Sequence, residues 1–298
     1  MSLTNYGYNA ASEKTVRERW RVAVPTELLA LVGLIGVVCW LVFPKDLASS
    51  LRSARMDAVT LSYTNAWLRA KPDDFDVRLV LAHNLMDLGL LDQARKQLDY
   101  IAAHTTDPAI RATQSWLRSR LPFIALMAIP PERRRDDPLW QQSRAALEDV
   151  DPATLSLRQL EHYAEMALLL EQPDAAVDAY HLLAEQQAFP ATWYARGGAA
   201  LLARGRYREA ANEYLLAMAS QENRYGRRRY FLAALSSLES GGLVREASEL
   251  GRREAEPFLN DQRVLYRLMN LARAADNLPL AEQYAILLLK LDQGLGTP

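Results

Sequence analysis

Apolar residues recur at helical spacing along most of the chain. In residues 158–172 and 175–187 they stand at positions i, i+3, i+4 and i+7, the pattern of a helix that buries one face. Both stretches are rich in Ala, Leu, Glu and Gln, which favour helices. No stretch shows a sustained alternation of apolar and polar residues, so the sequence predicts an all-α fold without a sheet.

Proline and aspartate mark the ends of several predicted helices. Pro108, Pro173 and Pro190 are expected to open a helix or to stop the preceding one from continuing. The acidic pairs at 73–74 and 136–137 adjoin prolines. We interpret these pairs as helix caps and not as catalytic carboxylates.

One segment is apolar on every side. Residues 28–44 carry no charged side chain and lie between Glu27 and Lys45. As a helix they would span about 25 Å, the short end of the range for crossing a bilayer. We therefore predict a transmembrane helix at 28–44. The alternatives are a buried core helix, which is rarely apolar all round, and a cleaved signal peptide, which needs a small-x-small site where Phe43-Pro44-Lys45 stands.

Basic residues favour one orientation of this helix. Those that precede it are Lys14, Arg17, Arg19 and Arg21, and those that follow it closely are Lys45, Arg52 and Arg55. The positive-inside rule therefore predicts a cytoplasmic N-terminal tail at 1–27. It also predicts a single-pass protein of the bacterial inner membrane whose C-terminal domain lies in the periplasm.

The C-terminal half carries small and large residues at fixed spacing. Spacings of 7, 2, 3, 4 and 3 separate Gly198, Gly205, Tyr207, Ala210, Tyr214 and Ala217. This pattern resembles that of the tetratricopeptide repeat (TPR) family, whose repeat is a pair of antiparallel helices. The small residues are expected where the two helices cross closely. Gly205 is expected to end the first helix in a left-handed conformation.

The same positions recur along the chain. Ala176, Ala210, Ala247 and Ala281 follow one another at intervals of 34, 37 and 34 residues. Upstream, the pattern returns at Ala82, Gly89, Ala94 and Leu98. The sequence therefore predicts one N-terminal transmembrane helix followed by an α-solenoid of TPR helix pairs.

These patterns also predict the order of segments. After the membrane helix we place a juxtamembrane linker at 45–56, N-terminal TPR-like helices at 57–130, an irregular connector at 131–155, a C-terminal TPR array at 156–291 and a tail at 292–298. Ala94 and Ala176 are 82 residues apart, which is not a multiple of 34, so we expect an interruption with a hinge near 130–137. Pro122 is expected to kink its helix.

Composition leaves little material for catalysis or metal binding. The 35 basic and 36 acidic residues nearly cancel, which disfavours a nucleic-acid binder. The single cysteine, Cys39, lies in the apolar segment, so we expect no disulfide framework and no cysteine zinc site. No phosphate-binding, dinucleotide-binding or hydrolase motif is present. We expect neither a cofactor, nor a metal, nor a small-molecule substrate.

Two features leave other functions open. His162 and His181 lie on neighbouring predicted helices with acidic residues close in sequence, which is the basis of an alternative in which the chain is an enzyme. The simpler interpretation is that both are hydrogen-bonded surface or groove histidines. The run 227–229 is all arginine, but its side chains would point in three directions on a helix and form no stripe for nucleic acid. An acidic partner, a polysaccharide or lipid headgroups match it better.

The resemblance to the TPR family implies a binding groove formed by the first helix of each pair. The family lines this groove with positions 2, 5, 9 and 12 of the repeat. With the four recurring alanines at position 20, these positions are Arg158, Glu161, Glu165, Leu168, Thr192, Ala195, Ala199, Leu202, Arg229, Leu232, Ser236, Glu239, Arg263, Tyr266, Asn270 and Arg273. The groove would be apolar in the middle with charged flanks, which suits an extended or helical peptide.

A second resemblance covers roughly residues 25–105. The stretches LVFPKDL at 41–47 and LSYTNAWLRAKPDDFDVRLVLAHNLMDLGLLDQARKQL at 61–98 are similar to the N-terminal region of Pel-type (PelB-like) exopolysaccharide secretion proteins. That resemblance implies a non-catalytic scaffold that links a membrane synthase to periplasmic enzymes or to the exporter. Members of that family continue into an outer-membrane segment that this sequence does not contain, so we expect a scaffold and not a pore.

The expected partners are therefore proteins in a membrane complex. The main alternative is a periplasmic TPR chaperone or adaptor for another envelope assembly pathway, such as cytochrome c maturation. The enzyme hypothesis built on His162 and His181 is the second alternative.

Overall fold

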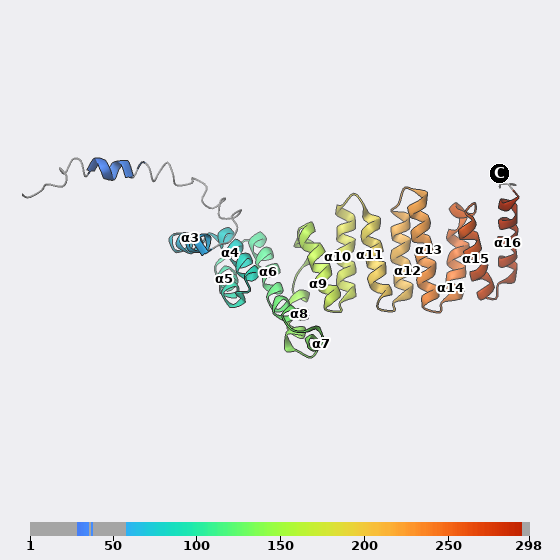
Figure 1. The fold of residues 1–298 in the computed structure, drawn as a ribbon, viewed down its shortest axis with the longest axis horizontal. Helices are drawn as coiled ribbons and strands as arrows, with labels where there is room; N and C mark the ends of the chain where they lie inside the picture. Colours follow the sequence, from blue (N-terminus) through green and yellow to red (C-terminus); the bar gives the residue numbers. More distant parts are fainter. Residues whose placement is uncertain (1–28, 36, 38–57, 294–298) are drawn as a thin grey trace, which may run out of the picture. The chain divides into compact units, whose positions relative to one another are not determined.

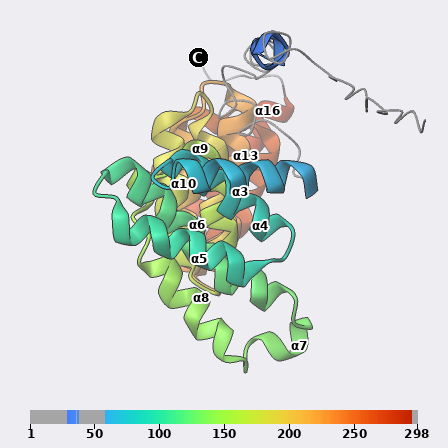
Figure 2. The ribbon, with the colours of Figure 1, turned by 90° about the vertical axis from the view of Figure 1, so that its left-hand side faces the viewer.

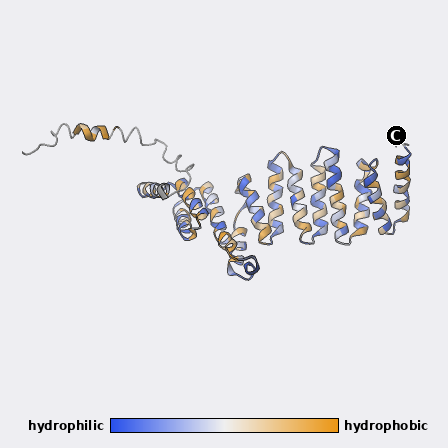
Figure 3. Ribbon diagram, viewed as in Figure 1, coloured by the Kyte–Doolittle hydropathy of each residue, from blue (hydrophilic) through white to orange (hydrophobic). Residues whose placement is uncertain are grey.

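The computed structural model describes residues 29–35, 37 and 58–293. The chain divides into two compact units, residues 1–55 and 56–298. In the first unit, residues 29–35 and 37 are helical and hydrophobic (Figure 3). Most of the predicted membrane helix at 28–44, the tail at 1–27 and the linker at 45–56 lie outside the described residues. Among the helices that the structure does describe, none combines the length and the apolarity that a bilayer crossing requires.

The described part of the second unit is built from helices, with no strand between residues 58 and 293, as the sequence predicted. Two short 3-10 helices, η1 (Pro152–Thr154) and η2 (Glu256–Phe258), accompany α3 (Ala58–Ala70), α4 (Phe75–Asp87), α5 (Leu91–His104), α6 (Pro108–Met127), α7 (Pro131–Arg134), α8 (Pro138–Glu148), α9 (Leu157–Leu169), α10 (Pro173–Gln186), α11 (Pro190–Leu202), α12 (Tyr207–Ala219), α13 (Arg224–Ser240), α14 (Val244–Glu254), α15 (Gln262–Ala274) and α16 (Leu278–Asp292).

Side chains and prolines start many of these helices. Asp107, Asp137 and Asp261 each precede a helix, and their carboxylates accept hydrogen bonds from its first free amides. Asp74 caps α4 in the same way and also accepts from the indole of Trp67 at 2.8 Å, which ties α3 to α4. The interpretation of Asp74 and Asp137 as helix caps is confirmed.

Left-handed residues separate the paired helices. Glu171, Gly205, Gly242 and Asp276 follow α9, α11, α13 and α15 and have φ angles of 58°, 73°, 70° and 58°. They lie 34, 37 and 34 residues apart, the period found in the sequence. Each such residue lets the chain turn back on itself at the end of a helix. Gly89, with φ 74°, does the same between α4 and α5.

The paired helices stack side by side from α9 to α16 (Figure 1). Recurring alanines make this stacking close, because Ala176, Ala210, Ala247 and Ala281 are all buried. At Gly198 a Cβ atom would stand 3.2 Å from the carbonyl oxygen of Ala210 and 3.1 Å from the ring of Tyr214, so the absence of a side chain lets α12 approach α11 closely. The predicted role of the small residues is therefore what the structure shows.

The helices before α9 depart from the regular repeat. α6 continues through Pro122 as one helix of 20 residues, although a proline there removes a backbone hydrogen bond. The predicted irregular connector at 131–155 contains α7, α8 and η1, and α8 packs on α6 through Trp140 and Leu147. The alanine register is broken here, between Ala94 and Ala176, which is why it could not reveal this contact. Figure 2 shows α7 and α8 beside the other helices of this unit.

Candidate functional site

The sixteen predicted groove residues all lie on α9, α11, α13 and α15, the first helix of each pair. None of them is buried. We call these sixteen residues the first-helix face. The structure thus places the residues on equivalent helices, with side chains that a partner can reach.

The middle and the flanks of the first-helix face differ in polarity. On α11, Thr192 and Ala199 are exposed while Ala195 and Leu202 are half-buried, so this part carries no charge. α9 contributes two carboxylates and one guanidinium, and α15 contributes Arg263 and Arg273. α13 adds Arg229 and Glu239, so the uncharged part of the face is confined to α11.

Arg267 of α15 contacts this face, although it is not one of the sixteen predicted residues. Its guanidinium donates to the hydroxyl of Ser236 at 3.1 Å and pairs with the carboxylate of Glu239, so it joins α15 to α13. Two of the sixteen predicted residues are therefore already engaged by a neighbouring repeat. The spacing between Glu239 and Arg267 differs from the repeat period, so a search at that period does not find this pair.

Tyr266 is the most prominent aromatic side chain of the first-helix face. It is 60% exposed. Together with Arg263, Leu288 and Leu289 it lines a cavity of about 430 Å³ between α15 and α16. Exposed tyrosine and arginine beside apolar side chains are favoured anchors of protein interfaces.

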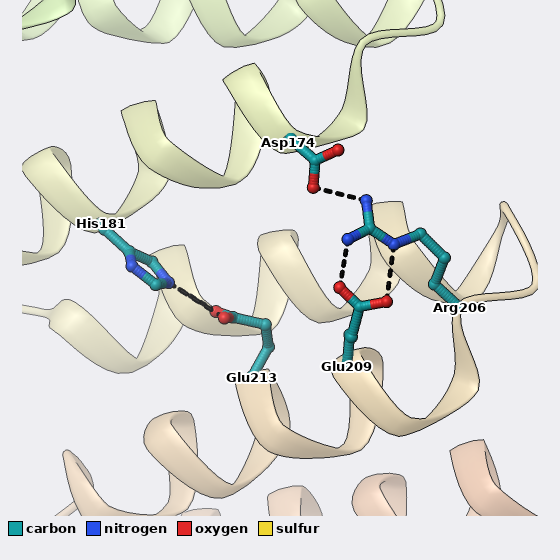
Figure 4. A network of polar contacts seen from close by, with 5 residues as sticks. All are labelled: Asp174, His181, Arg206, Glu209 and Glu213. Carbon is teal, nitrogen blue, oxygen red and sulfur yellow. Dashed lines mark hydrogen bonds and ion pairs between the residues drawn. The ribbon is translucent and has the colours of Figure 1, made fainter.

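The two histidines of the enzyme hypothesis do not form a common site. The Nε2 atom of His181 on α10 lies 2.9 Å from a carboxylate oxygen of Glu213 on α12 (Figure 4). The ring of His181 also meets the ring of Tyr194 edge-on, with 5.2 Å between the ring centres. His162 is exposed and lines a different cavity. No contact between the described residues joins the two histidines.

The His181–Glu213 pair spans α11, and glycine makes room for it. Glu213 is only 7% exposed, and a Cβ atom on Gly197 would stand 3.2 Å from its carboxylate. A buried carboxylate needs a partner of this kind, because an unpaired charge away from water is costly. This pair therefore fastens neighbouring repeats together. Within the described residues no cluster of three or more potential metal ligands occurs.

Further ion pairs link consecutive repeats. Arg206 bonds both Glu209 and Asp174, which connects α12 to α10 (Figure 4), and these bonds raise the pKa of Arg206, with that to Glu209 contributing most. Arg208 donates to Glu246 through two bonds of 2.7 Å, joining α12 to α14. Such contacts between neighbours are how a solenoid gains cooperativity.

The recurrence of the helix pairs, their left-handed turns and their buried alanines define an α-solenoid of TPR-type helix pairs. No family model matches the chain, and no curated protein matches it.

Two solved structures are similar to the chain at low level. One is PilW, described as a widely conserved type IV pilus biogenesis factor; it is 14% identical over 75% of this chain and 99% of its own, with a TM-score of 0.30. The other is BtubC (BKLC) from P. vanneervenii, which is 14% identical over 76% of this chain and 94% of its own, with a TM-score of 0.31. Neither likeness is close enough to carry an argument about function.

Proposed function

We propose that the chain is a non-catalytic scaffold that binds a protein partner through its first-helix face. The observation that carries the proposal is that sixteen residues at equivalent repeat positions are all accessible on α9, α11, α13 and α15. The buried side chains of each helix pair hold neighbouring helices together, and the exposed face of the first helices is left for recognition. The charges at its ends and the exposed Tyr266 supply orientation and an anchor.

The proposed setting is the bacterial envelope. The apolar segment at 28–44 would anchor the chain in the inner membrane, and the excess of basic residues before it favours a periplasmic solenoid. The resemblance over residues 25–105 supports a role in an exopolysaccharide synthesis and secretion complex of the Pel type. Reporter fusions at the C-terminus test the orientation, because alkaline phosphatase is active only in the periplasm.

Affinity capture from solubilised membranes tests the proposal itself. The full chain is compared with the Tyr266→Ala and Arg273→Ala variants and with Arg245→Ala, which removes an exposed arginine from the second helix α14. We expect the first two variants to lose captured partners and the third to retain them. Equal capture by all three variants would refute binding through the first-helix face.

A further inference from the structure

A second recess lies at the N-terminal end of the regular repeats, where α4, α6 and α9 meet. It has a volume of about 560 Å³, within the range of roughly 300–1,000 Å³ that is usual for ligand pockets. All three helices are first helices of their pairs, and α9 is the one that also carries part of the first-helix face. Arg158 of α9 therefore belongs both to the first-helix face and to the lining of the recess.

The floor of the recess is apolar. Leu79 of α4 and Trp116 and Leu117 of α6 are buried beneath it, and Val80 is half-buried at its wall. An apolar side chain that entered the recess would leave water and contact these residues, which favours binding.

The lining contains two arginines and two histidines and no carboxylate. His83, Arg120, Arg158 and His162 contribute from three helices. Arg158 makes no ion pair with any residue that the structure describes. An occupant with negative charge would complement this lining.

Arg120 is the most informative of these residues. Its guanidinium is half-buried, lies 3.3 Å from Nδ1 of His83 and stands 6.0 Å from the ring centre of Trp116. Burial lowers the pKa of Arg120, and the field of Asp87 only partly opposes this. Asp87 itself pairs with the other ring nitrogen of His83 at 3.6 Å. Arg120 is thus a partly desolvated cation with no carboxylate of its own within salt-bridge distance in the described chain, and an incoming carboxylate would compensate it.

We propose that the recess between α4, α6 and α9 is a docking site for an acidic segment of a protein partner. An apolar side chain of that segment fills the recess, and flanking carboxylates pair with Arg120 and Arg158. This inference rests on the proposed function in so far as the occupant is a protein. It adds a site that, apart from Arg158, lies outside the first-helix face.

The test measures fluorescence anisotropy of short labelled peptides with the purified full chain in a neutral detergent. The probes are a Glu–Leu repeat, a Lys–Leu repeat and a Glu–Ser repeat, which separate the charge from the apolar side chain. We expect the Glu–Leu peptide to bind best. The Arg120→Gln and Arg158→Gln variants should each weaken its binding by about tenfold, the scale of one charge-assisted pair. Arg120→Lys should recover part of the loss because it keeps the charge.

Arg118→Gln is the matched control, because Arg118 lies on the same helix but pairs with Asp99 of α5 at 3.0 Å. It should bind the Glu–Leu peptide as the unmodified chain does. Equal binding of the Lys–Leu peptide, or unchanged binding by the Arg120→Gln variant, would overturn the proposal. So would arginine-dependent binding to phosphatidylglycerol vesicles without any binding of the peptide, since the site would then recognise a lipid phosphate.

The same variants separate this inference from the proposed function. If only the inference fails, Arg120→Gln changes neither peptide binding nor partner capture, while Tyr266→Ala still reduces capture. If the proposed function fails, no variant of the first-helix face changes capture.

Discussion

At the residue scale, the contact between His181 and Glu213 shows how a repeat protein accommodates a buried charge. Gly197 has no side chain, and the space that this leaves on α11 lets a carboxylate from α12 reach an imidazole from α10. Three consecutive helices therefore depend on one another through three residues. The contact between His181 and Glu213 can therefore form only because Gly197 leaves room for it.

Replacing Glu213 by alanine should lower the free energy of unfolding by roughly 1–3 kcal/mol, because it removes a buried hydrogen-bonded partner and leaves a small void. Glu209→Ala is the matched control on the same helix, and its exposed pair with Arg206 should contribute under about 1 kcal/mol. Urea denaturation followed by circular dichroism measures both. Equal losses of unfolding free energy in the two variants would show that the buried pair stabilises the fold no more than the exposed one.

Sequence reasoning reached the repeat positions but not the contacts between them. The alanines and glycines predicted which helices pair, because small residues mark close crossings. The resemblance to the TPR family implied which positions of α9, α11, α13 and α15 line a groove. It could not find Arg267 beside Glu239, or Glu213 beside His181, because these contacts depend on how adjacent helices are offset. The recess around Arg120 was also missed, since the register of small residues is broken between Ala94 and Ala176.

At the element scale, the turns between paired helices differ in how well their residue suits a left-handed backbone. Gly205 and Gly242 have this conformation at little cost, whereas Asp276 has the same conformation with a Cβ atom. The turn between α15 and α16 therefore carries some strain.

Asp276→Gly should raise the free energy of unfolding by roughly 0.5–1 kcal/mol, because glycine relieves this strain. Asp276→Ala removes the same carboxylate but keeps the Cβ atom, so it should bring no gain. Thermal unfolding of the two variants measures the difference. An equal gain in stability for both variants would show that the effect comes from removing the carboxylate and not from relieving the left-handed backbone.

The start of α15 makes stability depend on pH. Burial alone would raise the pKa of Asp261, but the hydrogen bond from Arg228 and those from the amides of Val264 and Arg263 outweigh it, so the pKa is lowered. A lowered pKa in the folded state means that the stabilisation is fully present above the usual value near 4 and is lost as the pH falls below it.

Asp261→Asn keeps a capping side chain that does not titrate. Between about pH 5 and pH 3 this variant should lose roughly 1 kcal/mol less unfolding free energy than the unmodified chain. Asp292→Asn, at an exposed position in α16, is the control for the substitution itself. Urea unfolding at several pH values in this range measures the difference. If the unfolding free energies of Asp261→Asn and the unmodified chain fall in parallel with pH, the explanation is wrong.

At the scale of the whole molecule, each helix pair contacts mainly its neighbours. The stability of one pair should therefore depend mostly on the pairs beside it. The stacked rings of Phe231 and Phe258, 5.1 Å apart, lie in the core shared by α11 to α16. A substitution in this core should therefore destabilise the adjacent helices most, and helices farther along the solenoid less.

Phe231→Ala should therefore reduce hydrogen-exchange protection in α12 to α16 while α4 to α6 keep theirs. Mass spectrometry of exchanged peptides measures the protection of each helix. Uniform loss from α4 to α16 would show that the helices unfold as one cooperative block.

The central claim, that the chain acts through its first-helix face, is tested most directly by photo-crosslinking in intact cells. A photoreactive residue replaces Thr192, Ala199 or Ser236 on the first helices, or the exposed Asp178, Asn212 or Gln283 on the second helices. The account predicts crosslinks to a protein from the first set and few from the second. Crosslinks only from the second-helix positions, or none from either set, would contradict it.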